Sequence, residues 1–245
     1  MLYQLNDDNL TFPPINLALT EPNGLLAVGG DLHPNRLINA YNQGIFPWFS
    51  DGDPLMWWSP DPRAIIKLAD LRINKTLRKA IKKSPYRVTL NTDFEQVIAQ
   101  CANAPFRNDG TWILPKMEVA YNELHKLGYA HSIEIWQSSD EDALQPEHEN
   151  KEMLVGGLYG VAINGFFSGE SMFYTKSNAS KFAIIALAQL LNSLGIDFID
   201  CQLLNPFLVD MGASEVSRDE FTKIKKVAIN KKIETNFWQP RELYL

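Results

Sequence analysis

The pattern of apolar and polar positions divides the chain into two regions near residue 63. Before it, aromatic and apolar residues form short clusters interrupted by eight prolines. Proline fixes φ and removes a backbone donor, so this region cannot contain long regular elements. One helix is predicted over residues 34–43, with Pro34 in its first turn and Gly44 just after its end. We therefore predict a small N-terminal α/β domain over residues 1–63, built from short strands, turns and this helix.

After residue 63 the apolar positions become periodic. Strand-like patterns occupy residues 63–68, 86–91, 131–136, 153–163, 165–173 and 198–205, and helical patterns occupy 74–84, 93–103, 115–128, 178–195 and 219–231. Asn164-Gly165 separates two of the strand patterns and is a strong hairpin signal. In the helix over 115–128, Val119, Leu124 and Leu127 form the expected apolar side. The order predicts an α+β domain over residues 64–245, with antiparallel strands followed by a strand–helix–strand crossover.

The composition is that of a globular protein. The chain has 245 residues, 45% hydrophobic and 21% charged. No apolar run approaches the roughly 20 residues needed to span a bilayer, and the N-terminus lacks a basic-then-apolar export pattern. The two cysteines and four histidines show no metal-ligand spacing. We therefore expect a cytoplasmic protein without a metal.

The charge distribution is uneven, although the net charge is −6. Eight basic residues and one acid lie between Lys67 and Arg87, and five lysines without an acid lie between Lys223 and Lys232. Acidic residues concentrate between residues 140 and 152. Basic blocks of this kind can neutralise phosphates, but most charge runs are solvated helix faces. Composition alone does not decide between phosphate binding and a solvated helix face.

Three polar residues interrupt otherwise apolar strands: Glu170, Asp200 and Gln202. Side chains alternate along a strand, so Asp200 and Gln202 should share one face while Cys201 points to the other. A crossover connection often makes its two strands neighbours, which would bring Glu170 close to the other two. Two carboxylates and an amide could position an amine and handle its proton. A buried structural pair that satisfies backbone groups is the alternative.

Ten sequence blocks, in order, resemble the leucyl/phenylalanyl-tRNA–protein transferases, which are bacterial enzymes of the N-end rule pathway. The blocks are EPNGLLAVGGDL, AYNQGIFPW, MWWSPDPRA, GTWI, HSIEIW, LVGGLYGV, FFSGESMF, NASK, IDCQLLN and NFWQPREL. They extend from about residue 12 to about residue 242. The resemblance implies a larger domain similar to the acetyltransferase (GNAT-type, acyl-CoA N-acyltransferase-like) fold.

The resemblance also implies the reaction. Leucyl-tRNA or phenylalanyl-tRNA, and less well methionyl-tRNA, would donate the amino acid to a protein that begins with Lys or Arg. The free α-amine of that protein would attack the ester carbonyl and release tRNA, and the product would be marked for degradation. No cofactor, metal or ATP would be needed, because the ester is already activated. We expect a monomer that makes no membrane contact.

In this resemblance Glu170, Asp200 and Gln202 match the central polar group of the family. In one scheme the aspartate, through Gln202, helps to deprotonate the amine while Glu170 orients it; in another these residues mainly hold the donor ester while the ribose assists. The remaining matches are the donor side-chain pocket (Leu158, Phe167, Met172), aromatics near the 3′-terminal adenosine (Trp57, Trp58, Trp112, Tyr121) and contacts to tRNA phosphates (Arg72, Lys75, Arg78, Lys79, Lys82, Lys83, Arg87).

Two other functions fit parts of the sequence. A CoA-dependent N-acetyltransferase would share the fold, but such enzymes carry a glycine-rich turn before the helix that receives the pyrophosphate. The turn here reads YTKSNASK, without glycine, which counts against CoA. A non-catalytic tRNA-binding protein would have little use for polar residues in apolar strands. The acidic segment over residues 138–151 is expected to be a loop.

Overall fold

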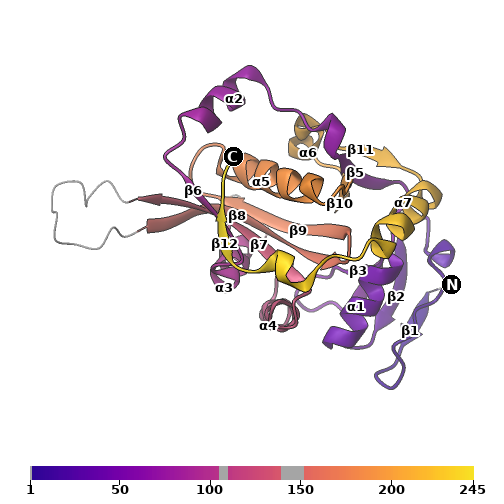
Figure 1. Cartoon of the computed structure of the whole chain (residues 1–245). Helices are drawn as coiled ribbons and strands as arrows, with labels where there is room; N and C mark the ends of the chain where they lie inside the picture. Colours follow the sequence, from indigo (N-terminus) through magenta and orange to yellow (C-terminus); the bar gives the residue numbers. More distant parts are fainter. Residues whose placement is uncertain (1, 105–109, 139–151) are drawn as a thin grey trace.

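The computed structural model describes residues 2–104, 110–138 and 152–245, apart from the side chain of Thr235, and shows an α+β fold with two sheets (Figure 1). The acidic segment predicted as a loop lies, except for Ser138, outside the described residues. Ser138 itself ends a strand rather than beginning a loop. The α+β class predicted from the sequence is confirmed.

The N-terminal region forms a four-stranded sheet with the order β1-β2-β4-β3. Its strands are β1 (Tyr3–Leu5), β2 (Leu25–Gly29), β3 (Phe46–Pro47) and β4 (Met56–Trp58). The short 3₁₀ helix η1 (Ile15–Leu17) and helix α1 (Pro34–Gln43) complete it. Gly44 ends α1 at φ 79°, a left-handed conformation that glycine adopts without strain. The predicted helix and its two end signals are therefore confirmed.

The second sheet has the order β11-β5-β10-β9-β8-β7-β6-β12. Its strands are β5 (Arg63–Lys67), β6 (Arg87–Leu90), β7 (Ala130–Ser138), β8 (Glu152–Ile163), β9 (Phe166–Tyr174), β10 (Phe198–Gln202), β11 (Ser214–Val216) and β12 (Arg241–Leu243). The predicted hairpin joins β8 to β9, with Asn164 at φ 52°. Strands β9 and β10 are parallel and the other pairs are antiparallel.

Helices cover both faces of the larger sheet (Figure 1). Helix α5 (Ala179–Ser193) packs on one face, and α3 (Phe94–Ala102) and α4 (Pro115–Lys126) pack on the other. The remaining helices are α2 (Lys75–Lys82), α6 (Pro206–Met211), α7 (Arg218–Asn230) and the 3₁₀ helices η2 (Leu68–Asp70) and η4 (Thr235–Trp238). The buried cluster under α3 and α4 continues into the N-terminal sheet. The division at residue 63 stays a prediction.

The apolar side predicted for α4 is wrong. Val119 is 65% exposed and Leu127 is 56% exposed, whereas Leu124 is buried. The buried stripe runs instead through Met117, Ala120, Tyr121 and Leu124, a helical spacing of three, four and seven residues. The prediction gave weight to aliphatic residues and none to the tyrosine that the fold buries.

Strands β9 and β10 position the candidate site. They are joined through α5, as the predicted crossover requires, and pair where Asp200 lies opposite Ser168. Within the described residues this is the one residue pair between the two strands, and β9 continues past it to Tyr174. The resulting opening next to the ends of the two paired strands contains Glu170 and Gln202, two of the predicted catalytic residues.

Candidate active site

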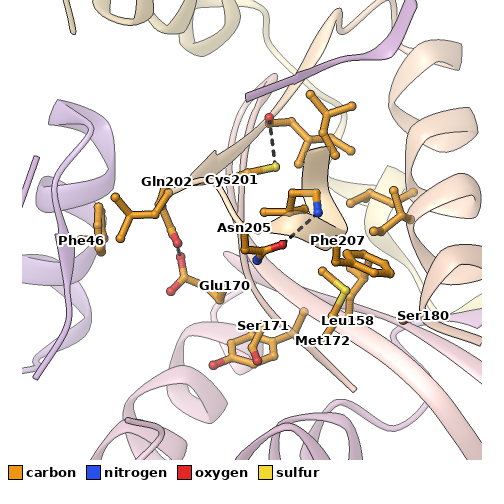
Figure 2. Close-up of a pocket in the computed structure, with 18 of the residues that line it drawn as sticks. Phe46, Leu158, Glu170, Ser171, Met172, Ser180, Cys201, Gln202, Asn205 and Phe207 are labelled. Atoms are coloured by element: carbon orange, nitrogen blue, oxygen red, sulfur yellow. Dashed lines mark hydrogen bonds between the residues drawn. The ribbon is translucent and has the colours of Figure 1, made fainter. Parts of the chain in front are cut away.

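A cavity of about 690 Å³ lies in the opening between β9 and β10. The second half of β9 and the end of β10 form two of its walls, and α5, α6 and the segment around Trp48 contribute the others. Figure 2 shows side chains from these elements converging on one space. Most of the lining is apolar, and Glu170 and Gln202 are hydrogen-bonded to each other on its wall. An apolar recess with a few convergent polar groups is the usual form of a small-molecule site.

Glu170 is the carboxylate on the cavity wall. Its Oε1 accepts a hydrogen bond from Gln202 Nε2 at 2.8 Å, and its Oε2 accepts one from the Tyr121 hydroxyl at 3.1 Å. Burial raises the pKa of Glu170 to about 7, opposed by hydrogen bonds from Tyr41, Tyr121 and Gln202 and reinforced by the charge of Asp200. A carboxyl group with a pKa near 7 can exchange a proton at neutral pH.

Asp200 is fully buried behind this wall. Its two oxygens accept from Arg63 Nε at 2.8 Å and from Arg63 Nη2 at 2.7 Å. Ser168 Oγ and the backbone N–H of Gln202 also donate to it, at 2.9 and 3.2 Å. Its oxygens are therefore occupied by four donors. Asp200 is fully buried and does not line the cavity.

Gln202 connects the two carboxylates. Its backbone has φ 62°, and the pairing register with β5 shifts between Asp200 and Gln202. Its Nε2 donates to Glu170 and lies 3.2 Å from Ser168 Oγ, which in turn donates to Asp200. The prediction that Asp200, Gln202 and Glu170 come together is therefore confirmed. The prediction that Asp200 and Gln202 share a face opposite Cys201 is wrong. At the register shift Cys201 and Gln202 both line the cavity, whereas Asp200 does not, and burial raises the pKa of the Cys201 thiol.

Two buried tyrosines support Glu170 from the opposite side. Tyr41 of α1 and Tyr121 of α4 share a short hydrogen bond between their hydroxyls, and both are fully buried. Burial, followed by the charge of Glu170, raises the pKa of each well above its ordinary value. Both tyrosines therefore remain neutral donors at neutral pH.

The sequence matches known proteins along nearly its whole length. The family model "Leucyl/phenylalanyl-tRNA protein transferase" matches residues 65–226, and the model for its N-terminal domain matches residues 30–61. A leucyl/phenylalanyl-tRNA–protein transferase from Colwellia psychrerythraea is 69% identical over 99% of this chain and 98% of its own length. One from Pseudoalteromonas atlantica is 50% identical over 99% and 97%.

This chain belongs to the leucyl/phenylalanyl-tRNA–protein transferase family. Two solved structures show weaker likeness. L-PGS from Bacillus licheniformis has a TM-score of 0.39 and 13% identity, covering 89% of this chain and 65% of that one. The C-terminal domain of a putative lysylphosphatidylglycerol synthetase from Agrobacterium fabrum has a TM-score of 0.38 and 9% identity, covering 89% and 66%. The assignment to the transferase family rests on the sequence matches.

Of the three residues expected in the donor pocket of a transferase of this family, two line the cavity and one does not. Leu158 and Met172 line the cavity, together with Ile184 and Leu187 of α5. Phe167 lies five positions before Met172 on β9, roughly 16 Å along a strand. It is buried and stacks on Trp238, with ring centroids 6.0 Å apart. Phe167 is therefore a core residue of this fold and not part of the cavity wall.

Of the four aromatic residues expected near the adenosine, one lines the cavity and three do not. Trp112 lines the cavity, whereas Trp57 is fully buried against Phe12 and donates from Nε1 to the Gly29 carbonyl. Trp58 supports Trp48 by an edge contact at 5.6 Å and donates to its carbonyl. The structure gives Trp57 a core role, and Tyr121 does not line the cavity but contacts two residues that do, Glu170 and Tyr159. Trp48, which was not predicted, is the exposed indole at the cavity.

The basic residues of the transferase divide into exposed ones and partly or fully buried ones. The exposed basic side chains on α2 and next to its two ends are those of Arg72, Lys75, Arg78, Lys79, Lys82 and Lys83. Arg87 instead forms an ion pair with Glu152 and lies over the Trp136 ring. In the second basic run Lys225 is buried and donates to the Asn42 carbonyl; burial, then the charge of Arg63, lowers its pKa to about 8.

Sequence reasoning missed several residues of the site: Tyr41, Arg63, Ser168 and Trp48. A signal for Arg63 was present, because a carboxylate inside an apolar strand needs a cation and Arg63 begins such a strand. Nothing local distinguished which of the many cations would fill that role. Among residues 2–104, 110–138 and 152–245, no cluster of His, Cys, Asp and Glu is arranged to hold a metal. No helix of this same portion is long and apolar enough to cross a membrane.

Proposed function

We propose that this chain transfers leucine or phenylalanine from its tRNA to the N-terminal α-amine of proteins that begin with Lys or Arg, and so marks them for N-end rule degradation. The observation that carries the proposal is the Glu170–Gln202 pair at the wall of an apolar cavity, in a chain whose family is named for this transfer. The reaction needs a recess for an apolar side chain beside a group that can take a proton from an amine, and the cavity combines both.

Proton transfer falls to Glu170 in this proposal. An N-terminal amine is mostly protonated below its pKa of about 7.7–8.0 and cannot attack a carbonyl in that form. The amine therefore loses one proton to solvent before it attacks. Glu170, with a pKa near 7, then accepts the second proton of the amine as the new N–C bond forms. The ester C–O bond then breaks, and the ribose oxygen leaves with a proton returned by Glu170. Asp200, already saturated by Arg63 and Ser168, positions Gln202 and takes no proton.

The apolar part of the cavity suits the donor side chain. Leu158, Met172, Ile184 and Leu187 supply aliphatic and thioether surface without charge. Burying a leucine or phenylalanine side chain there is favourable by about 1.5–3 kcal/mol, whereas a charged side chain would lose its hydration without a partner. This difference favours apolar donor side chains, such as those of leucine and phenylalanine, over charged ones.

The surroundings of the cavity suit the rest of the donor. Trp48 and Trp112 present aromatic surface where the 3′-terminal adenosine can stack. The exposed bases of α2 and the residues beside it can neutralise phosphates of the acceptor stem. The net charge of −6 leaves the remaining surface acidic, which favours proteins with a cationic N-terminus. We place the enzyme in the cytoplasm as a monomer, with no cofactor.

The direct test is transfer of radiolabelled leucine from leucyl-tRNA to a protein with N-terminal arginine, with the same protein carrying N-terminal glycine as control. Labelling of the arginine acceptor alone supports the proposal for both reaction and acceptor class. Absence of transfer by folded, tRNA-binding protein refutes the catalytic proposal and favours a tRNA-binding role. Labelling of both acceptors would support the proposed reaction but refute the proposed preference for an N-terminal arginine.

A further inference from the structure

The two oxygens of Glu170 are held by two separate chains of hydrogen bonds. Oε1 accepts from Gln202, which follows Asp200 on β10 and contacts it through Ser168 Oγ. Oε2 accepts from Tyr121, whose hydroxyl contacts that of Tyr41 in α1. The orientation of the Glu170 carboxylate therefore depends on where β10 and α1 lie relative to each other.

Arg63 contacts the far end of both chains. Its Nε and Nη2 donate to Asp200 at 2.8 and 2.7 Å, and its Nη1 donates to the Gly44 carbonyl at 3.1 Å. Gly44 ends α1, and its own N–H donates to the Tyr41 carbonyl at 3.0 Å. One guanidinium thus joins the strand that bears Gln202 to the helix turn that bears Tyr41.

The Arg63 guanidinium is held in place by the side chains packed around it. The side chain is 1% exposed and lies between the rings of Phe46 and Phe221, with its Cζ 4.9 and 4.6 Å from the two ring centroids. It does not line the cavity, so it acts on a substrate held there only through other residues. Only the planar, three-directional fork of arginine makes all three contacts at once, because the ammonium of lysine is a point charge.

We propose that Arg63 is a positioning residue for aminoacyl transfer, which sets the relative placement of β10 and α1 so that Gln202 and Tyr121 both reach Glu170. This inference rests on the proposed function. Loss of the guanidinium disturbs the geometry of the reacting carboxylate without removing any surface of the cavity. The rate of transfer should therefore fall while donor binding is kept, since displacement of about 1 Å can cost about 100-fold in rate.

A second consequence is electrostatic. The groups that face Glu170 are Tyr41 from α1, Tyr121 from α4 and Asp200 from β10, and the cations behind Asp200 are Arg63 and Lys225. The charge of Asp200 raises the pKa of Glu170, and Arg63 offsets that charge. Removing the positive charge should shift the rate–pH midpoint upward, whereas exchanging it for lysine should leave the midpoint in place.

Arg36 provides the matched control. It is also fully buried, and it donates to the carbonyls of Asn6 and Asn9 and to Asp31. Its bonds hold the N-terminal segment and none of them leads to Glu170. The experiment compares Arg63→Lys and Arg63→Met with Arg36→Lys and Arg36→Met. Leucine transfer is measured from about pH 5 to about pH 9, per folded molecule as counted by circular dichroism and by binding of leucyl-tRNA.

The proposal expects Arg63→Lys to lower kcat by up to about 100-fold with the KM for leucyl-tRNA little changed and the pH midpoint unmoved. Arg63→Met should lower kcat further and raise the midpoint. Both Arg36 variants should keep the wild-type kcat and midpoint in their folded fraction. If Arg63 and Arg36 variants lose activity only in proportion to unfolding, Arg63 is a structural residue and the inference is wrong. Inactivity of the wild-type protein would instead refute the proposed function.

Discussion

Gln202 donates a hydrogen bond from Nε2 to Glu170 Oε1 at 2.8 Å, across the opening where β9 and β10 cease to pair. Thirty-two positions separate these residues in the sequence. The contact orders the carboxylate that lines the cavity and leaves Asp200, the other carboxylate, to hold Gln202 from behind. The two acids therefore have different roles, and each role can be tested.

Glu170→Gln should lower kcat by about 100-fold or more, because general base catalysis contributes roughly 10²–10⁴-fold. Glu170 acts in its deprotonated form and its pKa is about 7, so wild-type activity should rise as the pH passes upward through 7. The acceptor amine titrates in both proteins. The measurement is the rate of single-turnover transfer as a function of pH for the wild type and for Glu170→Gln. The wild-type profile should contain one ionisation that the variant profile lacks. Profiles of identical shape would exclude Glu170 as the base.

Tyr121→Phe removes one hydroxyl that donates to Glu170 while keeping the buried ring. That hydrogen bond lowers the pKa of Glu170, so its loss should raise the pKa. Activity should fall more at about pH 6 than at about pH 8, and the midpoint should move to higher pH. The comparison is a pair of pH profiles, with thermal unfolding to confirm an intact fold. A midpoint at or below that of the wild type would contradict the role assigned to this hydroxyl.

Met172→Ala should alter donor choice, because Met172 lines the cavity. One methylene of apolar contact is worth about 1–3 kcal/mol, so the ratio of kcat/KM for phenylalanyl-tRNA and leucyl-tRNA should shift by about tenfold. Phe167→Ala is the contrasting variant. It removes a buried ring in the core and should lower the free energy of unfolding by about 3–5 kcal/mol without changing that ratio. If Phe167→Ala shifted the ratio of kcat/KM as much as Met172→Ala does, Phe167 would have to contact the donor side chain.

Lys79→Glu combined with Lys82→Glu should weaken tRNA binding, because both exposed lysines lie on α2. Each lost phosphate contact should reduce the slope of log affinity against log salt by about 0.7–0.9. At saturating leucyl-tRNA, kcat should change little. Lys126→Glu, at the exposed end of α4, is the control and should leave both affinity and slope unchanged. Unaltered salt dependence in the double variant would place the tRNA elsewhere.

Local signals in the sequence determined most elements of the fold. Pro34 and Gly44 bound α1, and Asn164-Gly165 joins β8 to β9, because these residues restrict or extend the backbone angles at their own positions. Short elements such as α6, β11 and β12 were not predicted, since their few residues carry no periodicity. Polar residues inside apolar strands marked Glu170, Asp200 and Gln202, as the cost of burying them without partners requires.

The partners of those residues were decided by the tertiary structure alone. Arg63 is separated from Asp200 by 137 positions, and Tyr41 is separated from Tyr121 by 80. No local preference encodes such pairs, because they arise only when the strand order and the packing of α1 and α4 bring the side chains together. The same holds for exposure: Trp57 is buried and Trp48 is exposed, although both are tryptophans in similar surroundings of the sequence. The sequence alone therefore indicates which single residues can carry out chemistry. Long-range packing decides which residues they contact and whether a substrate can reach them.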